Sequence, residues 1–413
     1  MIKEQRKDVT VMKRSVKAAA AMLCGILAVS AASCASQQTY PLTIDGEQIR
    51  AGIYLYQQFS SVNSAESKLG EEQPDLDTTA DGFDFTKQTV EGKSFGDWVK
   101  DNAIEECREF IAVKRLFASN GLTLTAEQNA SVKSNVNSIW DETNTYAQYL
   151  YGTDTVGAFF EKMGIGKQSF KELQEVSEMR TALFDHLYGE GGELAATQDE
   201  INAALKSDYS AIEYITYQLD NGDGAQAYVD RINNGESFEE IFRSYTDAYN
   251  TQEYEKELAE YEASKNEAAQ SEDGVTEVAE DADTADTAEA EPPVKPDPIS
   301  VPETDSLIVV INKDSTTPSE DFVKQVTELA ENTVSVVSVT SGETTTEYIV
   351  KKFDILSVPS DKTESAVTSL RTSLKEDEFN EMLHSAGDAY TVSEDSSINL
   401  YKVNKIIDVM NKK

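Results

Sequence analysis

The chain has 413 residues, with 36 Lys and Arg against 75 Asp and Glu, so its formal net charge is −39. Hydrophobic residues make up 39%, which rules against a fully disordered polymer, and at roughly 150 residues per domain two or three domains are expected. The excess of acidic residues argues against nucleic-acid binding. The chain has only two His and three Cys, which are too few for a multi-ligand zinc site or for most His-based catalytic centres. We therefore expect neither a metal nor a cofactor.

The first residues have the pattern of an export signal. Residues 1–17 are rich in Lys and Arg, residues 18–29 form an apolar run, and small residues follow up to Cys34. This order is typical of a secretory signal peptide, and the run is shorter than the roughly 20 residues of a transmembrane helix. Residues 1–33 are therefore predicted to be a signal peptide.

Cys34 is a predicted lipidation site. Ala-Ser-Cys after an apolar run resembles the bacterial lipobox, in which the cysteine is lipidated and becomes the first mature residue, although Ala31 stands where that motif usually has Leu. The alternative is ordinary cleavage beside a bystander cysteine. Lipidation predicts a protein held at the outer face of the bacterial cell membrane. Cys107 would then be the one free thiol, so no internal disulfide could form.

Residues 34–94 are expected to hold a strand, a helix and a loop. A strand-turn pattern covers 40–49, with Asp45 and Gly46 at the turn. An apolar helix is expected over 53–59, and the polar residues of 60–93 predict a loop.

Residues 95–207 are expected to form a helical lobe. Apolar residues recur every three or four positions over 95–119 and 169–188, and Thr125 opens a capping-box pattern for a helix to about residue 149. A similar pattern at Thr197 opens a fourth, short helix. Each helix has an apolar face that needs a partner, which predicts a bundle-like arrangement.

Residues 208–358 are expected to form a second domain that mixes strands and helices. The expected order is a strand over 212–217, two helices, a strand over 307–311, a helix over 319–331, and strands over 334–340 and 345–355. A last helix over 364–386 and a strand-like stretch over 398–407 lie in the segment 359–413, which is expected to return to the helical lobe.

An acidic insertion interrupts the second domain over 250–303. Residues 251–300 contain 16 acids and three lysines and few large apolar side chains. Such a segment cannot bury enough area to offset the loss of chain entropy. Most of it is expected to be disordered, with a helix over 251–269.

The order of these elements resembles the PrsA-type foldase lipoproteins, exported chaperones related to SurA that carry a parvulin-type prolyl isomerase domain between helical chaperone segments. The residues that match the family's motifs are 42–49, 164–170, 197–201, 234–238, 322–335 and 348–351. The resemblance covers nearly the whole mature chain. It implies an α+β fold, with a helical SurA-like chaperone lobe and a small parvulin-like α/β-sandwich domain.

The resemblance also implies a pocket at Tyr214, Phe322 and Tyr348. Phe322 matches the aromatic residue that receives the substrate proline ring. Tyr214 and Tyr348 stand where parvulins have histidines, and the family's pocket Asp or Cys has no counterpart, which leaves isomerase activity in doubt. The alternative is that the three rings fill the core of the small domain.

These features predict an exported, membrane-anchored chaperone that holds unfolded or folding secreted polypeptides. Its expected partners are those polypeptides and the membrane, through the lipid, with a homodimer as a further possibility. The alternatives are an active parvulin-type isomerase, a surface scaffold and a solute-binding lipoprotein. The last needs two α/β lobes, which the helical stretch from residue 95 to 205 contradicts.

Overall fold

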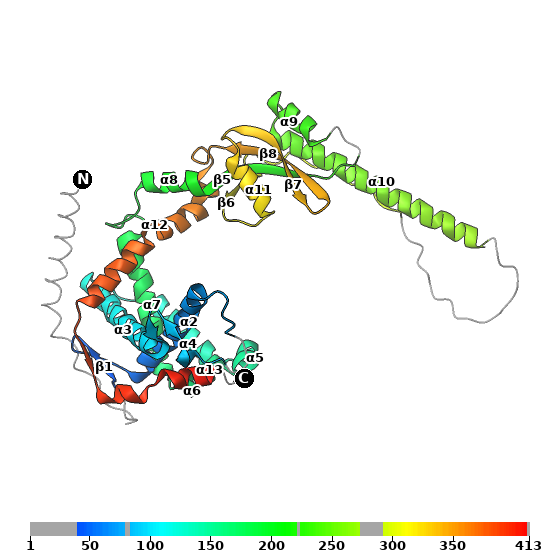
Figure 1. The fold of residues 1–413 in the computed structure, drawn as a ribbon. Helices are drawn as coiled ribbons and strands as arrows, with labels where there is room; N and C mark the ends of the chain where they lie inside the picture. Colours follow the sequence, from blue (N-terminus) through cyan, green and yellow to red (C-terminus); the bar gives the residue numbers. More distant parts are fainter. Residues whose placement is uncertain (1–38, 79–82, 221–223, 273–291, 411–413) are drawn as a thin grey trace, which may run out of the picture. The chain divides into compact units, whose positions relative to one another are not determined.

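A computed structural model describes residues 39–78, 83–220, 224–272 and 292–410 (Figure 1). The predicted signal peptide, 1–33, and Cys34 lie outside the described residues. Contacts divide the chain into two compact units. We call residues 1–195 and 375–413 the helical unit and residues 196–374 the sheet unit. Within the described part, no helix is both long enough and apolar enough to cross a membrane.

The helical unit is made of helices with small antiparallel strands at its edge. Its elements are β1 (Leu42–Ile44), β2 (Glu47–Ile49), α2 (Ala51–Glu72), η1 (Phe85–Lys87), β3 (Thr89–Val90), β4 (Lys93–Ser94), α3 (Phe95–Ser119), α4 (Ala126–Asp141), α5 (Thr145–Tyr151), α6 (Val156–Met163), α7 (Lys167–Tyr188), the later part of α12 (Ser360–Asp388), β9 (Val392–Glu394), η2 (Ser396–Leu400) and α13 (Val403–Met410). The predicted α+β fold class is confirmed.

Local caps account for several helix starts. Thr125 and Gln128 form the expected capping box, in which the Thr125 hydroxyl accepts from the Gln128 backbone N–H at 3.1 Å and the Gln128 side chain accepts from the Thr125 N–H at 2.9 Å. Asn144 caps α5 in the same way by accepting from the N–H of Ala147 at 2.9 Å. The helix predicted to run from 125 to about 149 is therefore two helices, because Asn144 begins a new one.

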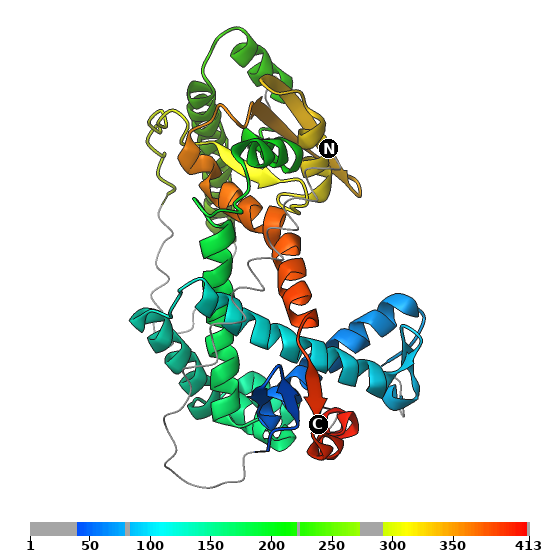
Figure 2. The same ribbon diagram turned by 90° about the vertical axis from the view of Figure 1, so that its left-hand side faces the viewer.

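The two ends of the helical unit meet in one small sheet. Strand β1 lies between β2 and β9, so the N-terminal hairpin pairs with a strand near the C-terminus (Figure 2). Arg115 on α3 supports this sheet: its Nε donates to Glu47 at 3.0 Å, its Nη1 donates to the Asp45 carboxylate, and its guanidinium lies 4.6 Å from the ring centroid of Tyr390. The sheet joins residues that lie about 350 positions apart in sequence.

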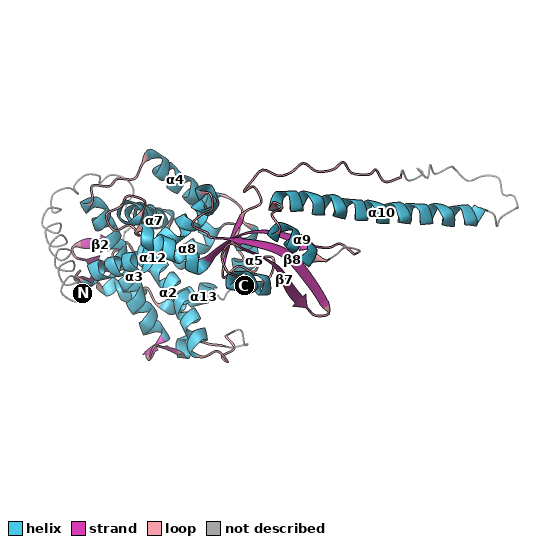
Figure 3. Cartoon of the chain, turned by 90° about the horizontal axis from the view of Figure 1, so that it is seen from above, coloured by secondary structure: helices cyan, strands magenta, loops and turns pink. Residues whose placement is uncertain are grey.

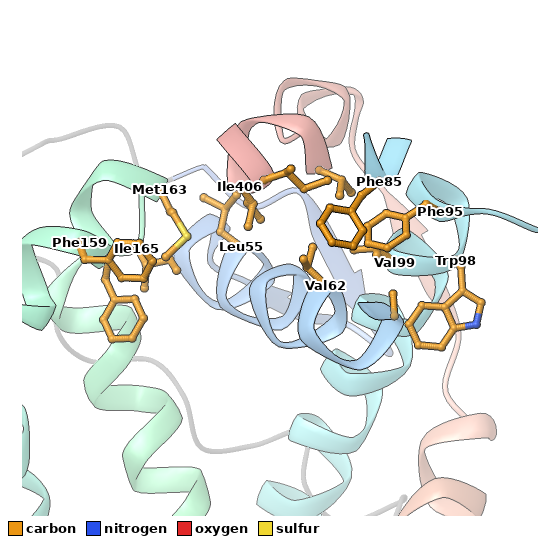
Figure 4. Close-up of a cluster of buried hydrophobic side chains, with 14 of the residues drawn as sticks. Leu55, Val62, Phe85, Phe95, Trp98, Val99, Phe159, Met163, Ile165 and Ile406 are labelled. Atoms are coloured by element: carbon orange, nitrogen blue, oxygen red, sulfur yellow. The ribbon is translucent and has the colours of Figure 1, made fainter. Parts of the chain in front are cut away.

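The buried core of this unit draws on both chain ends. Leu55 and Val62 of α2 pack with Phe95 of α3 and with Ile406 of α13 (Figure 4). The strand predicted over 398–407 is wrong: these residues form η2 and α13. Their β-branched side chains favour a strand locally, but burial of Val403, Ile406 and Ile407 on one helical face overrides that preference.

The sheet unit contains a four-stranded antiparallel sheet with helices on both faces. Its elements are α8 (Gln198–Asp208), β5 (Tyr209–Tyr217), α9 (Ala225–Asn233), α10 (Phe238–Glu272), β6 (Val309–Asn312), α11 (Glu320–Glu328), β7 (Thr333–Ser341), β8 (Thr344–Phe353) and the first part of α12. The strand order is β6-β5-β8-β7. Helices α9 and α10 pack on one face through Val229, Phe238 and Ile241, and α11 packs on the other through Phe322 and Val326.

Several boundaries differ from the expectations. Helix α2 continues to residue 72, inside the predicted loop over 60–93. The division between units falls at residues 195 and 374, so α8 belongs to the sheet unit and not to the helical lobe expected to end at 207. Helix α10 has 35 residues and extends beyond the sheet (Figure 3). It confirms the helix expected over 251–269. The first part of the segment 250–303, which was expected to be mostly disordered, is therefore helical as far as residue 272. Residues 273–291 of the acidic insertion lie outside the described residues.

Candidate functional site

The sheet unit brings the three predicted pocket residues together. Tyr214 lies on β5, Tyr348 on β8 and Phe322 on α11. The ring centroids of Phe322 and Tyr348 are 4.6 Å apart, those of Tyr214 and Phe322 are 5.3 Å apart, and those of Tyr214 and Tyr348 are 6.2 Å apart. These separations are typical of interacting aromatic side chains.

The aromatic trio is packed between α11 and the sheet. Phe322 is 0% exposed and Tyr348 is 8% exposed, while Tyr214 is half-buried. The neighbours in the same cluster are aliphatic, among them Val326 and Val350. A substrate proline ring cannot reach the fully buried Phe322 in this arrangement, so the geometry fits core packing better than an isomerase pocket.

The helical unit contains a second candidate site, a hollow of about 230 Å³ between α2, α3 and α7. We call it the α3–α7 hollow. It is lined by Tyr56, Gln57, Glu106, Glu109, Phe110, Val113, Leu173, Gln174, Val176, Ser177 and Arg180. The aliphatic and phenyl side chains among these are buried, whereas the polar side chains at its edge, apart from the buried Gln57, are half-buried or exposed. The hollow therefore has an apolar floor and a mainly polar rim.

Helical spacing explains why acids share this apolar hollow. Glu106, Glu109, Phe110 and Val113 stand at positions i, i+3, i+4 and i+7 of α3, which places them on one face. Phe110 belongs to the apolar face predicted for the helix over 95–119, and no site residue was predicted on that helix. The site could have been found in the sequence from this spacing, because it places the carboxyls of Glu106 and Glu109 on a helix face that is otherwise apolar.

The two carboxyls of the hollow differ in their partners. Glu109 has two basic side chains beside it, with Arg180 Nη1 3.9 Å from its Oε2 and His384 Nδ1 3.5 Å from its Oε1. Glu106 makes no hydrogen bond or ion pair with any residue in the described part of the chain. Burial raises the pKa of Glu106, and the charge of Glu109 adds to that shift while Arg180 opposes it. Burial also raises the pKa of Glu109, against the effect of Arg180 and His384.

Arg180 is engaged by the later part of α12. Its Nη2 donates to Asn380 Oδ1 at 2.5 Å, and its guanidinium carbon lies 5.3 Å from the ring centroid of Phe379. A guanidinium fixed by three neighbours cannot also swing to a fourth group without losing one of them. Glu106 is consequently the open charged group of the hollow.

The pKa of Glu106 predicts a pH-dependent effect of Glu106→Gln. A carboxyl whose pKa is raised in the folded state favours folding below its unfolded pKa, and this contribution is lost as the pH rises through the folded pKa. Glu106→Gln should therefore raise the Tm of the helical unit at pH 7.5, on the order of a few degrees, and the gain should vanish towards pH 4.

Tryptophan fluorescence checks this prediction, because Trp98 and Trp140 are the two tryptophans of the chain and both belong to the helical unit. Glu193→Gln is the matched control, since Glu193 is exposed in the same unit. A Tm that falls in Glu106→Gln at pH 7.5, or a difference that does not change with pH, would contradict the burial argument.

Helix α5 presents a second apolar surface in the helical unit. Tyr146 and Tyr149 are 75% and 84% exposed, and Leu150 is 40% exposed. These residues stand at i, i+3 and i+4, so they share one side of the helix. Exposed tyrosines offer an apolar ring and a hydroxyl, a combination that is enriched at binding surfaces.

One group of side chains has the donor types of a metal site. Ligand atoms of Glu105, His384 and Asp388 lie within 4.8 Å of one another. Arg108 Nη1 lies 2.8 Å from Glu105 Oε1 and 3.6 Å from Asp388 Oδ1, so a fixed cation already balances both carboxylates. This donor set therefore does not fit a divalent ion well.

Comparisons with known proteins find similar solved structures, two of which are described here. No protein-family model and no curated protein matches the chain. The foldase protein PrsA from Lactococcus lactis is 12% identical, with 90% of this chain and 99% of that chain covered and a TM-score of 0.30. The foldase protein PrsA from Streptococcus pneumoniae is 13% identical, with 78% and 99% covered and a TM-score of 0.31. Both are named for the family that the sequence motifs resemble.

Proposed function

We propose that the chain is an exported chaperone that holds unfolded or folding secreted polypeptides. Its place would be the outer face of the bacterial cell membrane, with a lipid on Cys34 as the anchor. The role needs no metal, cofactor or nucleic acid. A homodimer stays a prediction, and sedimentation velocity of the mature chain would test it.

The observation that carries this proposal is the α3–α7 hollow. Its floor of Phe110, Val113, Leu173 and Val176 offers apolar surface below a polar rim. Burying one aliphatic or aromatic side chain contributes about 1.5–3 kcal/mol and requires no particular sequence. Such a site binds weakly and tolerates many clients, as a holding chaperone must.

The charge of the chain supports the same role. A net charge of −39 keeps a protein soluble even when it carries an apolar client, and it favours clients that are basic. Electrostatic attraction of this kind acts mainly on the rate of association and weakens with salt. The chaperone is therefore expected to hold basic clients best at low ionic strength.

An aggregation assay tests the proposed function. The mature chain without its lipidated Cys34, from residue 35 onward, is added to a client diluted from denaturant, and light scattering is followed. We expect scattering to slow in proportion to the amount of chain added. Ser177→Trp should weaken the effect by filling the rim of the hollow, and Ser134→Trp, at an exposed serine on α4, should not. The proposal fails if the mature chain neither slows aggregation nor binds the client.

Lipid attachment is tested separately. In cells fed radiolabelled palmitate, we expect label on the wild-type chain and on Cys24→Ser, because Cys24 leaves with the signal peptide. Cys34→Ser should carry no label, since the acceptor thiol is gone. Label that persists in Cys34→Ser would contradict the predicted anchor.

A further inference from the structure

We propose that the α3–α7 hollow selects a lysine or arginine side chain of the client, with the methylene stem on the apolar floor and the cation at Glu106. This inference rests on the proposed function and names the class of client segment that the site prefers. Three observations lead to it: the shape of the hollow, the pairing of its charges, and the position of Glu106 at its edge.

The shape fits one long side chain. A hollow of about 230 Å³ has no room for a helix or strand, but it can take a single side chain that enters from the rim. Lysine and arginine bury their methylene stems against apolar surface and keep the charged end near solvent. Phe110, Val113, Leu173 and Val176 supply that surface, and half-buried Glu106 stands beside Phe110 at helical spacing.

One carboxylate of the hollow, that of Glu106, has no ion pair and can accept a cation from a client. Glu109 is paired with Arg180 and lies beside His384, and Arg180 also contacts Asn380 and Phe379. Glu106 lines the same hollow and makes no hydrogen bond or ion pair among the described residues, although the charge of Arg180 acts on it from a distance. A partly buried carboxylate without a partner is unfavourable, and an incoming cation relieves that cost.

The same charges disfavour the other classes of side chain. An acidic side chain would meet Glu106 and Glu109 together, with Arg180 already engaged. A purely apolar side chain would fit the floor but would cover Glu106 without pairing it, which adds to the cost of its burial. The expected order of preference is therefore cationic, then apolar, then acidic.

Fluorescence anisotropy with three labelled peptides tests this order. The peptides share one apolar host sequence and differ at a central position, which is lysine, norleucine or glutamate. Titrated with the mature chain, the lysine peptide should bind about three- to tenfold more tightly than the norleucine peptide, and the glutamate peptide should bind most weakly. Norleucine keeps the length of the stem, so the difference between the first two peptides isolates the charge.

Glu106→Gln should remove the lysine preference, because the lysine peptide loses its carboxylate partner and the norleucine peptide no longer covers an unpaired charge and binds more tightly. Glu193→Gln should keep both affinities as in the wild type. The inference is overturned if lysine and norleucine bind alike, or if the lysine preference survives in Glu106→Gln. It is also overturned if no peptide binds while the chain still slows aggregation, a result that leaves the proposed function standing. If the chain neither binds any of the peptides nor slows aggregation, the proposed function is wrong as well.

Discussion

Phe379→Ala is expected to destabilise the helical unit by about 3–5 kcal/mol, because it removes a fully packed ring from the core. Phe379 is 2% exposed. Its ring centroid lies 5.2 Å from that of Phe184 and 5.8 Å from that of Tyr188, both on α7. Urea denaturation followed by tryptophan fluorescence measures the loss, since both tryptophans report on this unit.

The control for Phe379→Ala is Leu400→Ala in the same unit. Leu400 is 73% exposed, so its truncation should change the free energy of unfolding by less than about 0.5 kcal/mol. A loss of less than about 1 kcal/mol in Phe379→Ala would mean that α12 does not contribute to the core of the helical unit. The contacts of Arg180 with Asn380 and Phe379 on α12 would then also be in error.

Phe322→Ala is expected to destabilise the sheet unit by a similar amount, about 3–5 kcal/mol, while the tryptophan signal of the helical unit stays unchanged. The side chain is fully buried against Tyr214 and Tyr348, and its removal leaves a cavity between α11 and the sheet. Hydrogen exchange of β5 and β8 measures the effect, because the sheet unit contains no tryptophan. Protection that is unchanged in Phe322→Ala would contradict the core assignment.

A proline-limited refolding assay separates core packing from catalysis at the same residues. We expect the wild-type chain to leave the slow phase unchanged, because Phe322 is closed to a substrate ring. Phe322→Leu keeps most of the buried volume and should remain folded. Acceleration by the wild type that Phe322→Leu abolishes would establish the isomerase alternative.

Much of the fold could be predicted because it is encoded locally. The capping residues Thr125 and Thr197 begin helices as their patterns predict. The hairpin at Asp45 and Gly46 forms where two residues adopt positive φ, 45° and 88°. The order of strands and helices in the sheet unit also follows the change in period along the chain.

The parts that could not be predicted depend on distant contacts. The C-terminal residues around Ile406 form a helix because α2 offers an apolar face more than 300 positions earlier in the chain. The difference between Glu106 and Glu109 likewise depends on α12, which brings His384 to Glu109 and engages Arg180 through Asn380. Spacing along α3 could have placed both acids on one face, but it could not have shown which acid is paired.

Site-specific photo-crosslinking tests most directly whether the helical unit holds unfolded polypeptide. A photoreactive residue is placed in the mature chain at Ser177, an exposed position on the rim of the hollow, or at Ser338, an exposed position on β7 of the sheet unit. With a denatured, labelled client, we expect strong crosslinking from Ser177 and little from Ser338. Crosslinking that is absent at Ser177, or equal at the two positions, would contradict it.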